Sequence, residues 1–323
     1  MGQDNLMKRG IVMRILVTGG AGFIASHVVD KLIELKHHVC IVDNLFNGKE
    51  DNINDKATFY KCDITEMEKL KIVFKVEKPE VVIHHAAQID IQISIEKPVF
   101  DAEVNIIGTI NILECCREFG VRKIIYPSSA SVYGEPRYLP VEENHEINPI
   151  SFYGISKHTP EYYIKAYARL YGFTYSIFRY ANVYGERQDP TGEGGVVSIF
   201  VDKLLNNQIP FIFGNGEQTR DFIYVKDIAE ANILALYKGD NEIMNISSNK
   251  ATTVNELFML MRDIAGSNVE AIYKDVRKGD IEHSYLDNEK ARKKLGWKGR
   301  FKLEDGLRET VQYYKKVNYK NNK

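Results

Sequence analysis

Tyr153 and Lys157 stand four residues apart, so a helix would carry this phenol and this ammonium on one face. A phenol with a pKa near ~10 is a weak base at neutral pH, and a neighbouring cation favours its phenolate form. Because the chain has 19 tyrosines, the spacing alone has low specificity. Ser129, in the block Ser-Ser-Ala-Ser-Val-Tyr-Gly (128–134), supplies a hydroxyl that can hydrogen-bond a substrate alcohol and relay its proton. Together the three residues indicate proton transfer at an alcohol.

Two other kinds of chemistry are disfavoured by neighbouring residues. No Gly-x-Ser-x-Gly elbow surrounds Ser129, so a serine nucleophile is not expected. His84 and His85 are adjacent, but consecutive residues of a strand point to opposite faces and cannot share one ion. We therefore expect no metal, and we expect a structural role for His84. The alternative interpretation of the serine block is a polar turn without a catalytic role.

A glycine-rich turn joins the first apolar strand to the first amphipathic helix, in the block Thr-Gly-Gly-Ala-Gly-Phe-Ile-Ala (18–25). Glycines allow a tight turn and close backbone approach to a pyrophosphate, and the helix N-terminus adds free N–H donors. Asp43 follows Gly22 by 21 residues, at the end of the second strand. Its carboxylate would accept hydrogen bonds from ribose hydroxyls and repel a 2′-phosphate, which predicts NAD rather than NADP. Asp63 could hold the adenine edge, although a solvated loop aspartate accounts for it almost as well.

Short apolar runs alternate with amphipathic stretches in the first half of the chain. The expected strands are residues 15–18, 38–42, 81–84, 123–127 and 175–179. The expected helices are residues 25–35, 66–76, 104–119 and 159–171. Apolar strands separated by helices indicate an α/β fold with a Rossmann-type doubly wound parallel sheet. Such sheets bind ligands at the carboxyl ends of their strands, where the glycine turn, Asp43 and Ser129 all lie.

The pattern changes near residue 186, where glycines, prolines and scattered aromatic residues interrupt the alternation. We expect residues 13–185 to form the nucleotide-binding domain, and residues 219–246 to return to it. Residues 186–218 and 247–318 would then form a smaller α/β substrate-binding domain. Residues 1–12 are interpreted as an N-terminal extension and residues 319–323 as a tail.

The composition restricts the class of partner. The 323 residues include 43 Lys or Arg and 44 Asp or Glu, which gives a net charge of −1. This balance provides no global field to attract nucleic acid or an anionic membrane, so an anionic ligand must be bound by local cations. No apolar run reaches the ~18 residues of a membrane span. Four cysteines without metal-type spacing predict reduced thiols and a cytoplasmic protein.

Taken in order, these blocks resemble the extended short-chain dehydrogenase/reductase family, and most closely its UDP-glucose 4-epimerase group. The similarity extends from residue 13 to about residue 314. Its further blocks are Val-Asp-Asn (42–44), Cys-Asp-Ile (62–64), His-His-Ala-Ala-Gln (84–88), Asn-Ile-Ile-Gly-Thr (105–109), Arg-Tyr-Ala-Asn-Val-Tyr-Gly (179–185), Gly-Asn-Gly-Glu-Gln-Thr-Arg-Asp-Phe (214–222), Arg-Lys-Gly-Asp (277–280) and Leu-Gly-Trp (295–297). So many blocks in register make the resemblance specific.

The resemblance implies a set of site residues. Tyr153 would be the catalytic base and Ser129 its partner, while Lys157 would hold the nicotinamide ribose and lower the Tyr153 pKa. The residues implied to contact NAD are Gly19, Gly22, Phe23, Ile24, Asp43, Asn44, Asp63, Ile64, Ala86, Asn105, Tyr153, Lys157 and Tyr180. The residues implied to bind the nucleotide sugar are Ser129, Tyr153, Asn182, Phe211, Arg220, Arg277 and Asp280. Members usually dimerise through the helices expected at 104–119 and 159–171, so a homodimer is expected.

The reaction implied by the resemblance is NAD-dependent 4-epimerisation of a UDP-hexose. Tyr153 would take the C4 hydroxyl proton while the C4 hydride passes to tightly bound NAD, and the 4-keto sugar would then turn over and be reduced on its other face. Ser284 is small, which resembles members that take UDP-GlcNAc and UDP-GalNAc as well as UDP-glucose and UDP-galactose. Ala130 and Ser131 follow Ser129 without a carboxylate, which disfavours a dehydratase or a decarboxylase.

Two alternatives stay open at this point. A UDP-glucuronate 4-epimerase, or another nucleotide-sugar-modifying member of the family, shares the serine block. A non-catalytic NAD-sensing protein is the remote interpretation, and the presence of Tyr153, Lys157 and Ser129 disfavours it. Asp90 and Ala181 depart from the usual pattern, and Asp90 is expected to face the sugar pocket, so the sugar preference is open.

Overall fold

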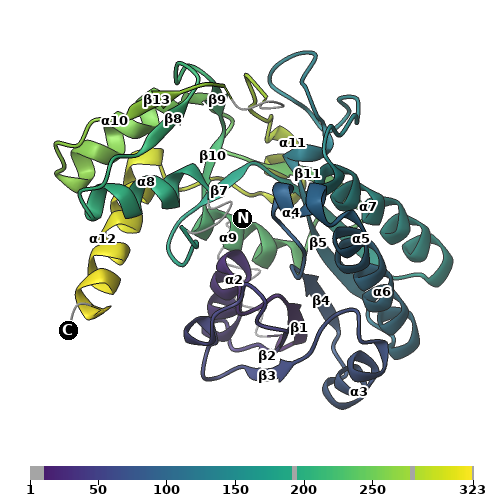
Figure 1. Ribbon diagram of the computed structural model, residues 1–323. Helices are drawn as coiled ribbons and strands as arrows, with labels where there is room; N and C mark the ends of the chain where they lie inside the picture. The colour runs from purple at the N-terminus through teal and green to yellow at the C-terminus, as the bar shows by residue number, and fades with distance from the viewer. Residues whose placement is uncertain (1–10, 191–194, 277–280, 322–323) are drawn as a thin grey trace.

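Seven parallel strands form the central sheet in the order β11-β6-β5-β4-β1-β2-β3 (Figure 1). The computed structural model describes residues 11–190, 195–276 and 281–321. The strands of this sheet are β1 (Arg14–Thr18), β2 (His38–Asp43), β3 (Thr58–Lys61), β4 (Val81–His84), β5 (Lys123–Ser129), β6 (Thr174–Tyr180) and β11 (Glu242–Ile246). The strand order reverses between β1 and β4, which is where such sheets bind ligands. This arrangement confirms the predicted doubly wound parallel sheet.

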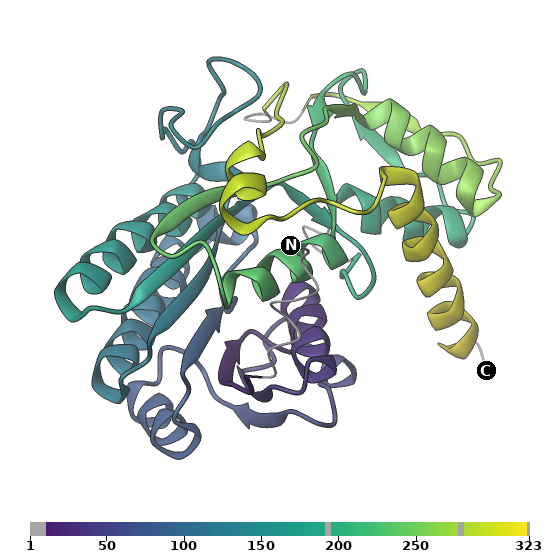
Figure 2. The same ribbon diagram turned by 180° about the vertical axis from the view of Figure 1, so that it is seen from behind.

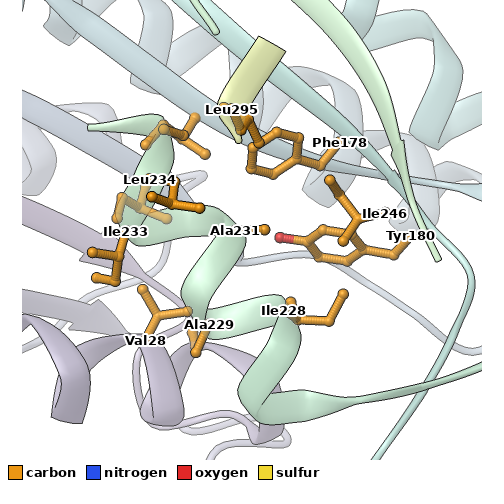
Figure 3. Packing of buried hydrophobic residues seen from close by; sticks show 14 of the residues in the cluster. Val28, Phe178, Tyr180, Ile228, Ala229, Ala231, Ile233, Leu234, Ile246 and Leu295 are labelled. Atoms are coloured by element: carbon orange, nitrogen blue, oxygen red, sulfur yellow. The ribbon is translucent and has the colours of Figure 1, made fainter. Parts of the chain in front are cut away.

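Helices cover both faces of the sheet, because alternate strand residues carry apolar side chains to opposite sides. The long flanking helices are α2 (Phe23–Glu34), α3 (Met67–Glu77), α6 (Gly108–Phe119), α7 (Phe152–Tyr171) and α9 (Val225–Ala235). In β1, Ile15 and Val17 join the core under α2 and α9, whereas Leu16 joins the core under α3, α6 and α7. Figure 3 shows the first of these cores, where residues of α9 pack against Phe178 and Tyr180 of β6.

A second group of elements stands at one end of the sheet (Figures 1 and 2). Its elements are β7 (Asn182–Tyr184), α8 (Val196–Leu205), β8 (Phe211–Phe213), β9 (Thr219–Arg220), β10 (Phe222–Tyr224), β12 (Thr252–Thr253), α10 (Val254–Ala265), β13 (Ile272–Lys274) and α12 (Leu303–Asn321). Helix α11 (Glu289–Leu295) instead packs against β11 and α9, in the first core of the central sheet. The strands pair as β7 with β10, β9 with β12, and β8 with β13. A third hydrophobic core lies among α8, α10 and α12. Within the described ranges, no helix is long and apolar enough to cross a membrane.

The helix expected at 104–119 is one part of a longer helical run. The run begins with α4 (Ile91–Glu96) and α5 (Pro98–Ala102) and passes through a π-helical turn, η2 (Glu103–Ile107), before α6. Wide turns of this kind occur often at functional sites. Here the turn contains Asn105, one of the residues expected at the cofactor site.

Helix α7 begins at Phe152 rather than at residue 159, so the predicted start was wrong. The Oγ of Ser151 accepts a hydrogen bond from the Gly154 N–H at 3.0 Å and caps the helix. Pro160 is accommodated inside the helix. The earlier start is what places Tyr153 and Lys157 in the first turns of α7, on one face.

Trp297 connects the segment after α11 to helix α9. We expect the substitution Trp297→Ala to lower the free energy of unfolding by about 3–5 kcal/mol. The indole is 0% exposed, and its Nε1 donates a hydrogen bond to the Asp227 carbonyl oxygen at 2.9 Å. Urea unfolding followed by circular dichroism measures the loss. Ile72→Ala, at a side chain that is 63% exposed, is the control and is expected to stay within about 0.5 kcal/mol of wild type. A loss below about 1 kcal/mol for Trp297→Ala would contradict the tight packing.

Candidate active site

The glycine turn between β1 and α2 has a conformation that only glycine adopts readily. Gly19 has a φ of +70°, and a Cβ at this position would lie 2.7 Å from the Ala86 backbone nitrogen. Such a contact is too short for any side chain, so the turn can lie against the end of β4 only with glycine here. Gly22 stands at the N-cap position of α2, whose first N–H groups are therefore available to an anion.

A groove of about 690 Å³ runs along the carboxyl edge of the sheet beside this turn. Its volume lies within the range of small-molecule sites, about 300–1,000 Å³. The expected cofactor residues that line it are Gly19, Gly22, Phe23, Ile24, Asp43, Asn44, Asp63, Ile64 and Ala86. Gly19 and Gly22 line the groove without side chains, so a pyrophosphate can approach the backbone closely, and the residues present fit a dinucleotide.

Asp43 and Asp63 define one end of the groove. Asp43 ends β2 and accepts hydrogen bonds from the backbone N–H groups of Ala21 (3.0 Å) and Leu45 (2.8 Å). Burial raises the pKa of Asp43, and these two hydrogen bonds oppose the rise. Burial also acts to raise the pKa of Asp63, but hydrogen bonds from Thr65 and from Asn44, at 2.7 Å, lower it overall. Two carboxyl groups with fixed orientations therefore line the groove, where the ribose of the dinucleotide is expected to bind.

The loop of residues 186–189, which follows β7, forms two ion pairs with residues of the N-terminal part of the chain. Arg187 and Asp30 of α2 form an ion pair of 2.8 Å, and Lys49 and Asp189 form another of 2.8 Å. Arg187 and Asp189 also line the groove. Sequence reasoning missed this loop, because its partners lie more than a hundred residues away and no local pattern marks them.

Tyr153, Ser129 and Lys157 come together where β5 ends and α7 begins. Ser129 ends β5, and its side chain lies close enough to the Tyr153 phenol to lower the pKa of that phenol as a hydrogen-bond partner. Lys157 is buried, one helical turn after Tyr153, and its Nζ lies 4.6 Å from the centre of the Tyr126 ring. The hydroxyl and the phenol therefore lie close together, as a site of proton transfer requires.

Burial is the main influence on the pKa values of both groups. It raises the pKa of the Tyr153 phenol, and the hydrogen bond with Ser129 opposes the rise. It lowers the pKa of Lys157 to about 7, against the opposing effects of Glu161 and Asp101. The lowering of the Tyr153 pKa by Lys157, implied by the family resemblance, is not the dominant effect and stays a prediction.

Asn105 is held in a buried network rather than at the groove wall. Its Nδ2 donates to the Ser156 Oγ at 2.9 Å and to the Asp101 carboxylate at 3.2 Å, and its Oδ1 accepts from the Gln88 N–H at 2.8 Å. Gln88 donates to Asp101 in turn, at 2.7 Å. Because Ser156 lies between Tyr153 and Lys157 on α7, the network fixes the part of α7 that carries these two residues. Asp101, the carboxylate of this network, was not identified from the sequence.

The two adjacent histidines, one ending β4 and the other just after it, have different environments. The His84 ring is hydrogen-bonded to the hydroxyls of Thr18 (2.7 Å) and Thr109 (3.0 Å), which supports a structural role. His85 lines the groove, and its ring nitrogens are buried without a hydrogen-bond partner among the described residues. Burial lowers the pKa of both rings to about 3, so both are neutral. Across the described ranges, no group of three His, Cys, Asp or Glu side chains could hold a metal ion.

Tyr180 and Asn182 follow one another closely at the end of β6. Tyr180 lies beside Ser129 in the register of the sheet, and its OH accepts a hydrogen bond from Asn232 at 2.7 Å. Asn182 is exposed at the start of β7, and its backbone N–H donates to the Asp221 carbonyl oxygen at 2.9 Å. Both residues are thus placed past the carboxyl end of the sheet, on the side of the active site.

The other expected sugar-binding residues lie on the small sheets. Phe211 of β8 is 42% exposed, and the Lys274 Nζ lies 3.5 Å from the centre of its ring. Arg220 of β9 donates to the Thr219 carbonyl oxygen at 2.9 Å. Ser284 lies beside this strand, because its N–H donates to the same oxygen at 3.1 Å. Arg277 and Asp280 lie outside the described residues.

Asp90 has a local structural partner as well as a place at the groove. Its Oδ1 accepts a hydrogen bond from the Ile93 N–H at 2.9 Å and caps α4. It also lines the groove next to Ile89. The cap accounts for an aspartate at this position without a sugar contact.

The low pKa of Lys157 gives a prediction for stability. At pH 6 the folded protein holds a buried ammonium, so Lys157→Met is expected to be more stable than wild type there. The folded protein releases this proton near pH 7, whereas the unfolded chain keeps it to its usual pKa of 10.5. Between these values wild type is expected to gain about 1.4 kcal/mol per pH unit relative to the variant. Urea unfolding of both proteins from about pH 6 to pH 9 measures this, and a constant difference would contradict the lowered pKa.

The doubly wound sheet and the glycine turn define a dinucleotide-binding α/β protein, and the Tyr153–Ser129 pair lies at the carboxyl edge of the same sheet. The model of the NAD dependent epimerase/dehydratase family matches residues 15–247, and the chain belongs to this family. This confirms the family expected from the sequence blocks.

Relatives of known name cover nearly the whole chain. A Methanocaldococcus jannaschii protein is 55% identical over 306 residues, which are 94% of this chain and 99% of that protein. The crystal structure of a UDP-glucose 4-epimerase from Thermotoga maritima with UDP-glucose is 49% identical, with a TM-score of 0.93, and the match covers 95% of this chain and 100% of that one. A UDP-N-acetylglucosamine 4-epimerase from Methanobrevibacter ruminantium, in complex with UDP-N-acetylmuramic acid, is 36% identical with a TM-score of 0.90, over 95% of this chain and 99% of that one.

Proposed function

We propose that this protein is an NAD-dependent 4-epimerase of UDP-hexoses, which interconverts UDP-glucose with UDP-galactose and UDP-GlcNAc with UDP-GalNAc. The observation that carries the proposal is the proximity of the Ser129 and Tyr153 side chains at the carboxyl edge of the sheet that also carries the dinucleotide groove. The similarity to named 4-epimerases over nearly the whole chain supports it.

The mechanism follows from the positions of the three catalytic residues. The Tyr153 oxygen takes the proton of the sugar C4 hydroxyl, and the Ser129 hydroxyl holds that hydroxyl in line and relays the proton. NAD, when bound in the groove, supplies the reversible oxidation of C4. The Lys157 ammonium stabilises the phenolate while the keto sugar turns over, and Tyr153 then returns the proton to the inverted alcohol.

The UDP part of the substrate requires firm binding, because the sugar must turn while the nucleotide stays in place. We propose Asn182, Phe211 and Arg220, together with Arg277 and Asp280, for this role. Arginine binds a diphosphate with two parallel hydrogen bonds, which a chain with a net charge of −1 must provide locally. The domain division given above, with the substrate bound by the second part, is proposed on the same basis.

The proposal is tested by incubating the purified protein, without added NAD, with UDP-glucose, UDP-GlcNAc or UDP-glucuronate. Proton NMR then follows inversion at C4 for each sugar. Inversion of the first two is the expected result. Selective turnover of UDP-glucuronate would replace the substrate class, and no turnover even with NAD supplied would favour a binding protein.

Ser284→Tyr is expected to lower kcat/KM for UDP-GlcNAc by at least about 10-fold and to leave the value for UDP-glucose within about threefold. The added ring would occupy space beside Arg220 that the N-acetyl group needs, and such steric discrimination is worth about 1–3 kcal/mol. Ser284→Ala is the matched control and is expected to keep both substrates. An equal loss for both sugars would contradict a role of this position in sugar selection.

We also propose a homodimer formed through the outer face of α6 and α7. Ile107 is 50% exposed just before α6, and Tyr163 of α7 is 41% exposed, which leaves apolar surface on two neighbouring helices. Sedimentation velocity of wild type is expected to show a dimer, and Ile107→Glu combined with Tyr163→Glu a monomer. Ile72→Glu, on the exposed side of α3, is the control. A monomeric wild type would contradict the proposal.

We propose the cytoplasm as the location. All four cysteines are buried free thiols, which is typical of proteins from a reducing compartment. Burial raises their pKa values, that of Cys62 to about 11, so they stay protonated and unreactive.

A further inference from the structure

Glu161 and Arg179 form an ion pair in the protein interior, beneath the carboxyl ends of β5 and β6. Their side chains are 0% and 4% exposed. The Arg179 Nη2 lies 2.7 Å from one carboxylate oxygen of Glu161, and the Nε lies 3.1 Å from the other. Both oxygens thus bind the guanidinium, in the two-point geometry that fixes orientation as well as distance.

The pair is attached to three segments that carry active-site residues. The Ser128 Oγ donates to Glu161 at 2.6 Å, and Ser128 immediately precedes Ser129. Arg179 immediately precedes Tyr180, which lies beside Ser129 in the sheet. Glu161 itself follows Lys157 by one turn of α7. One buried carboxylate therefore connects the strand end, the neighbouring strand and the catalytic helix.

The network continues from Arg179 toward β11. The Arg179 Nη1 donates to the Tyr133 OH at 3.0 Å and to the Glu143 carbonyl oxygen at 3.2 Å. The Tyr133 OH donates to the Asn245 Oδ1 at 2.7 Å. Since Tyr133 and Asn245 are also buried, Arg179 has little freedom to move, and Glu161 is held by a fixed partner.

Stability alone does not account for a charged pair at this place. Apolar residues of similar volume often hold packed elements equally well, because burying two charges offsets their attraction. An apolar pair could not bind the Ser128 hydroxyl, however, and could not place a negative charge near the Lys157 ammonium. Those two properties are specific to a carboxylate at residue 161.

We propose that Glu161 is a positioning residue for the epimerase reaction, which fixes the Ser129 hydroxyl against the Tyr153 phenol through Ser128 and Arg179 and places a negative charge one turn from the Lys157 ammonium. This inference rests on the proposed function. Glu161 is too deeply buried to touch the substrate, so it acts through its neighbours.

The charged groups around Lys157 show how the loss of Glu161 would change the pKa of Lys157. The titratable groups around it are Tyr153 and Glu161 of α7, Tyr126 of β5, His84 of β4, His85 just after β4, and Asp101 of α5. Among them, Glu161 opposes most strongly the effect of burial on the Lys157 pKa. Without this carboxylate, Lys157 loses its proton at lower pH, and the alkaline limb of the pH–rate profile moves to lower pH.

The main test uses Glu161→Gln combined with Arg179→Met, which removes both charges and leaves no buried ion unpaired. We expect kcat for UDP-glucose to fall about 10- to 100-fold, since small displacements of catalytic groups have effects of this size. KM is expected to stay within about twofold, and the alkaline limb to move down by at least about one pH unit. Asp240→Asn is the matched control, because Asp240 pairs with the buried Lys123 (2.5 Å) at the other end of β5. It is expected to keep the wild-type profile.

A milder variant separates positioning from folding. Ser128→Ala keeps the ion pair and removes only the hydroxyl that Glu161 binds, and we expect a severalfold lower kcat with an unchanged pH profile. Wild-type kcat and profile in the double variant, wild-type kcat in Ser128→Ala, or an equal loss in Asp240→Asn would each overturn the inference. If the double variant does not fold, Ser128→Ala decides. An inactive wild type would instead contradict the proposed function.

Discussion

Tyr153→Phe is expected to lower kcat for UDP-glucose at least about 1,000-fold, while the purified protein keeps its NAD. The phenyl ring fills the same space, so only the oxygen that exchanges the C4 proton is lost, and general acid–base catalysis contributes about 10²–10⁴-fold. The NMR assay of C4 inversion measures kcat, and chromatography of the denatured protein measures bound NAD.

Tyr162→Phe is the matched control for this prediction. The Tyr162 ring is on the same helix and is 61% exposed, so its hydroxyl is expected to have no effect on turnover. Activity of Tyr153→Phe within about tenfold of wild type would show that another group is the base. Loss of both activity and NAD would show that the phenol acts mainly in cofactor binding.

Gly19→Ala is expected to abolish the retention of NAD and to weaken its affinity at least about 100-fold. The new methyl group would lie 2.7 Å from the Ala86 backbone nitrogen at a φ of +70°, so the turn must shift. Strain and displacement of about 3 kcal/mol correspond to a loss of this size. Calorimetric titration of cofactor-free protein with NAD measures the affinity.

Gly120→Ala is the matched control, because it introduces the same backbone strain as Gly19→Ala without the close contact of the added methyl group. Gly120 has a φ of +71°, nearly the same as Gly19, but an added Cβ there has nothing within 4 Å. It ends α6 as a left-handed cap, away from the groove. We expect this variant to lose about 1 kcal/mol of stability and to keep NAD. Equal NAD affinity in Gly19→Ala and wild type would contradict a role of the glycine turn in binding NAD.

The central sheet was predictable because each strand is a short apolar run between amphipathic helices. The start of α7 was missed, since its first turns mix polar and apolar residues and its cap is a single serine, Ser151. The strands of two or three residues, such as β9 and β12, have no periodicity to detect. Their positions depend on Asp221, whose buried carboxylate binds the backbone of residues 248, 249 and 286.

The site was predictable where chemistry is local in sequence. The glycine turn, Asp43 and the Tyr153–Lys157 spacing all stand next to recognisable strand or helix ends. Asp101 and Glu161 were not found, because most of their partners lie on other elements, 13 to 33 residues away, and acidic residues in helices are ordinarily solvated. Only packing shows that these two carboxylates are buried around Lys157.

Strand β11 has a consequence for synthesis and truncation of the chain. It pairs with β6 along Ser176–Tyr180, yet β6 leaves the ribosome 66 residues earlier, as the pair Ser176 and Glu242 shows. Until β11 arrives, one side of β6 is an open edge with unpaired N–H and C=O groups beside the apolar Phe178. A fragment that contains β6 but stops before residue 242 retains that edge and is expected to aggregate. Most of the chain must therefore be synthesised before β11 can pair with β6 and complete the sheet.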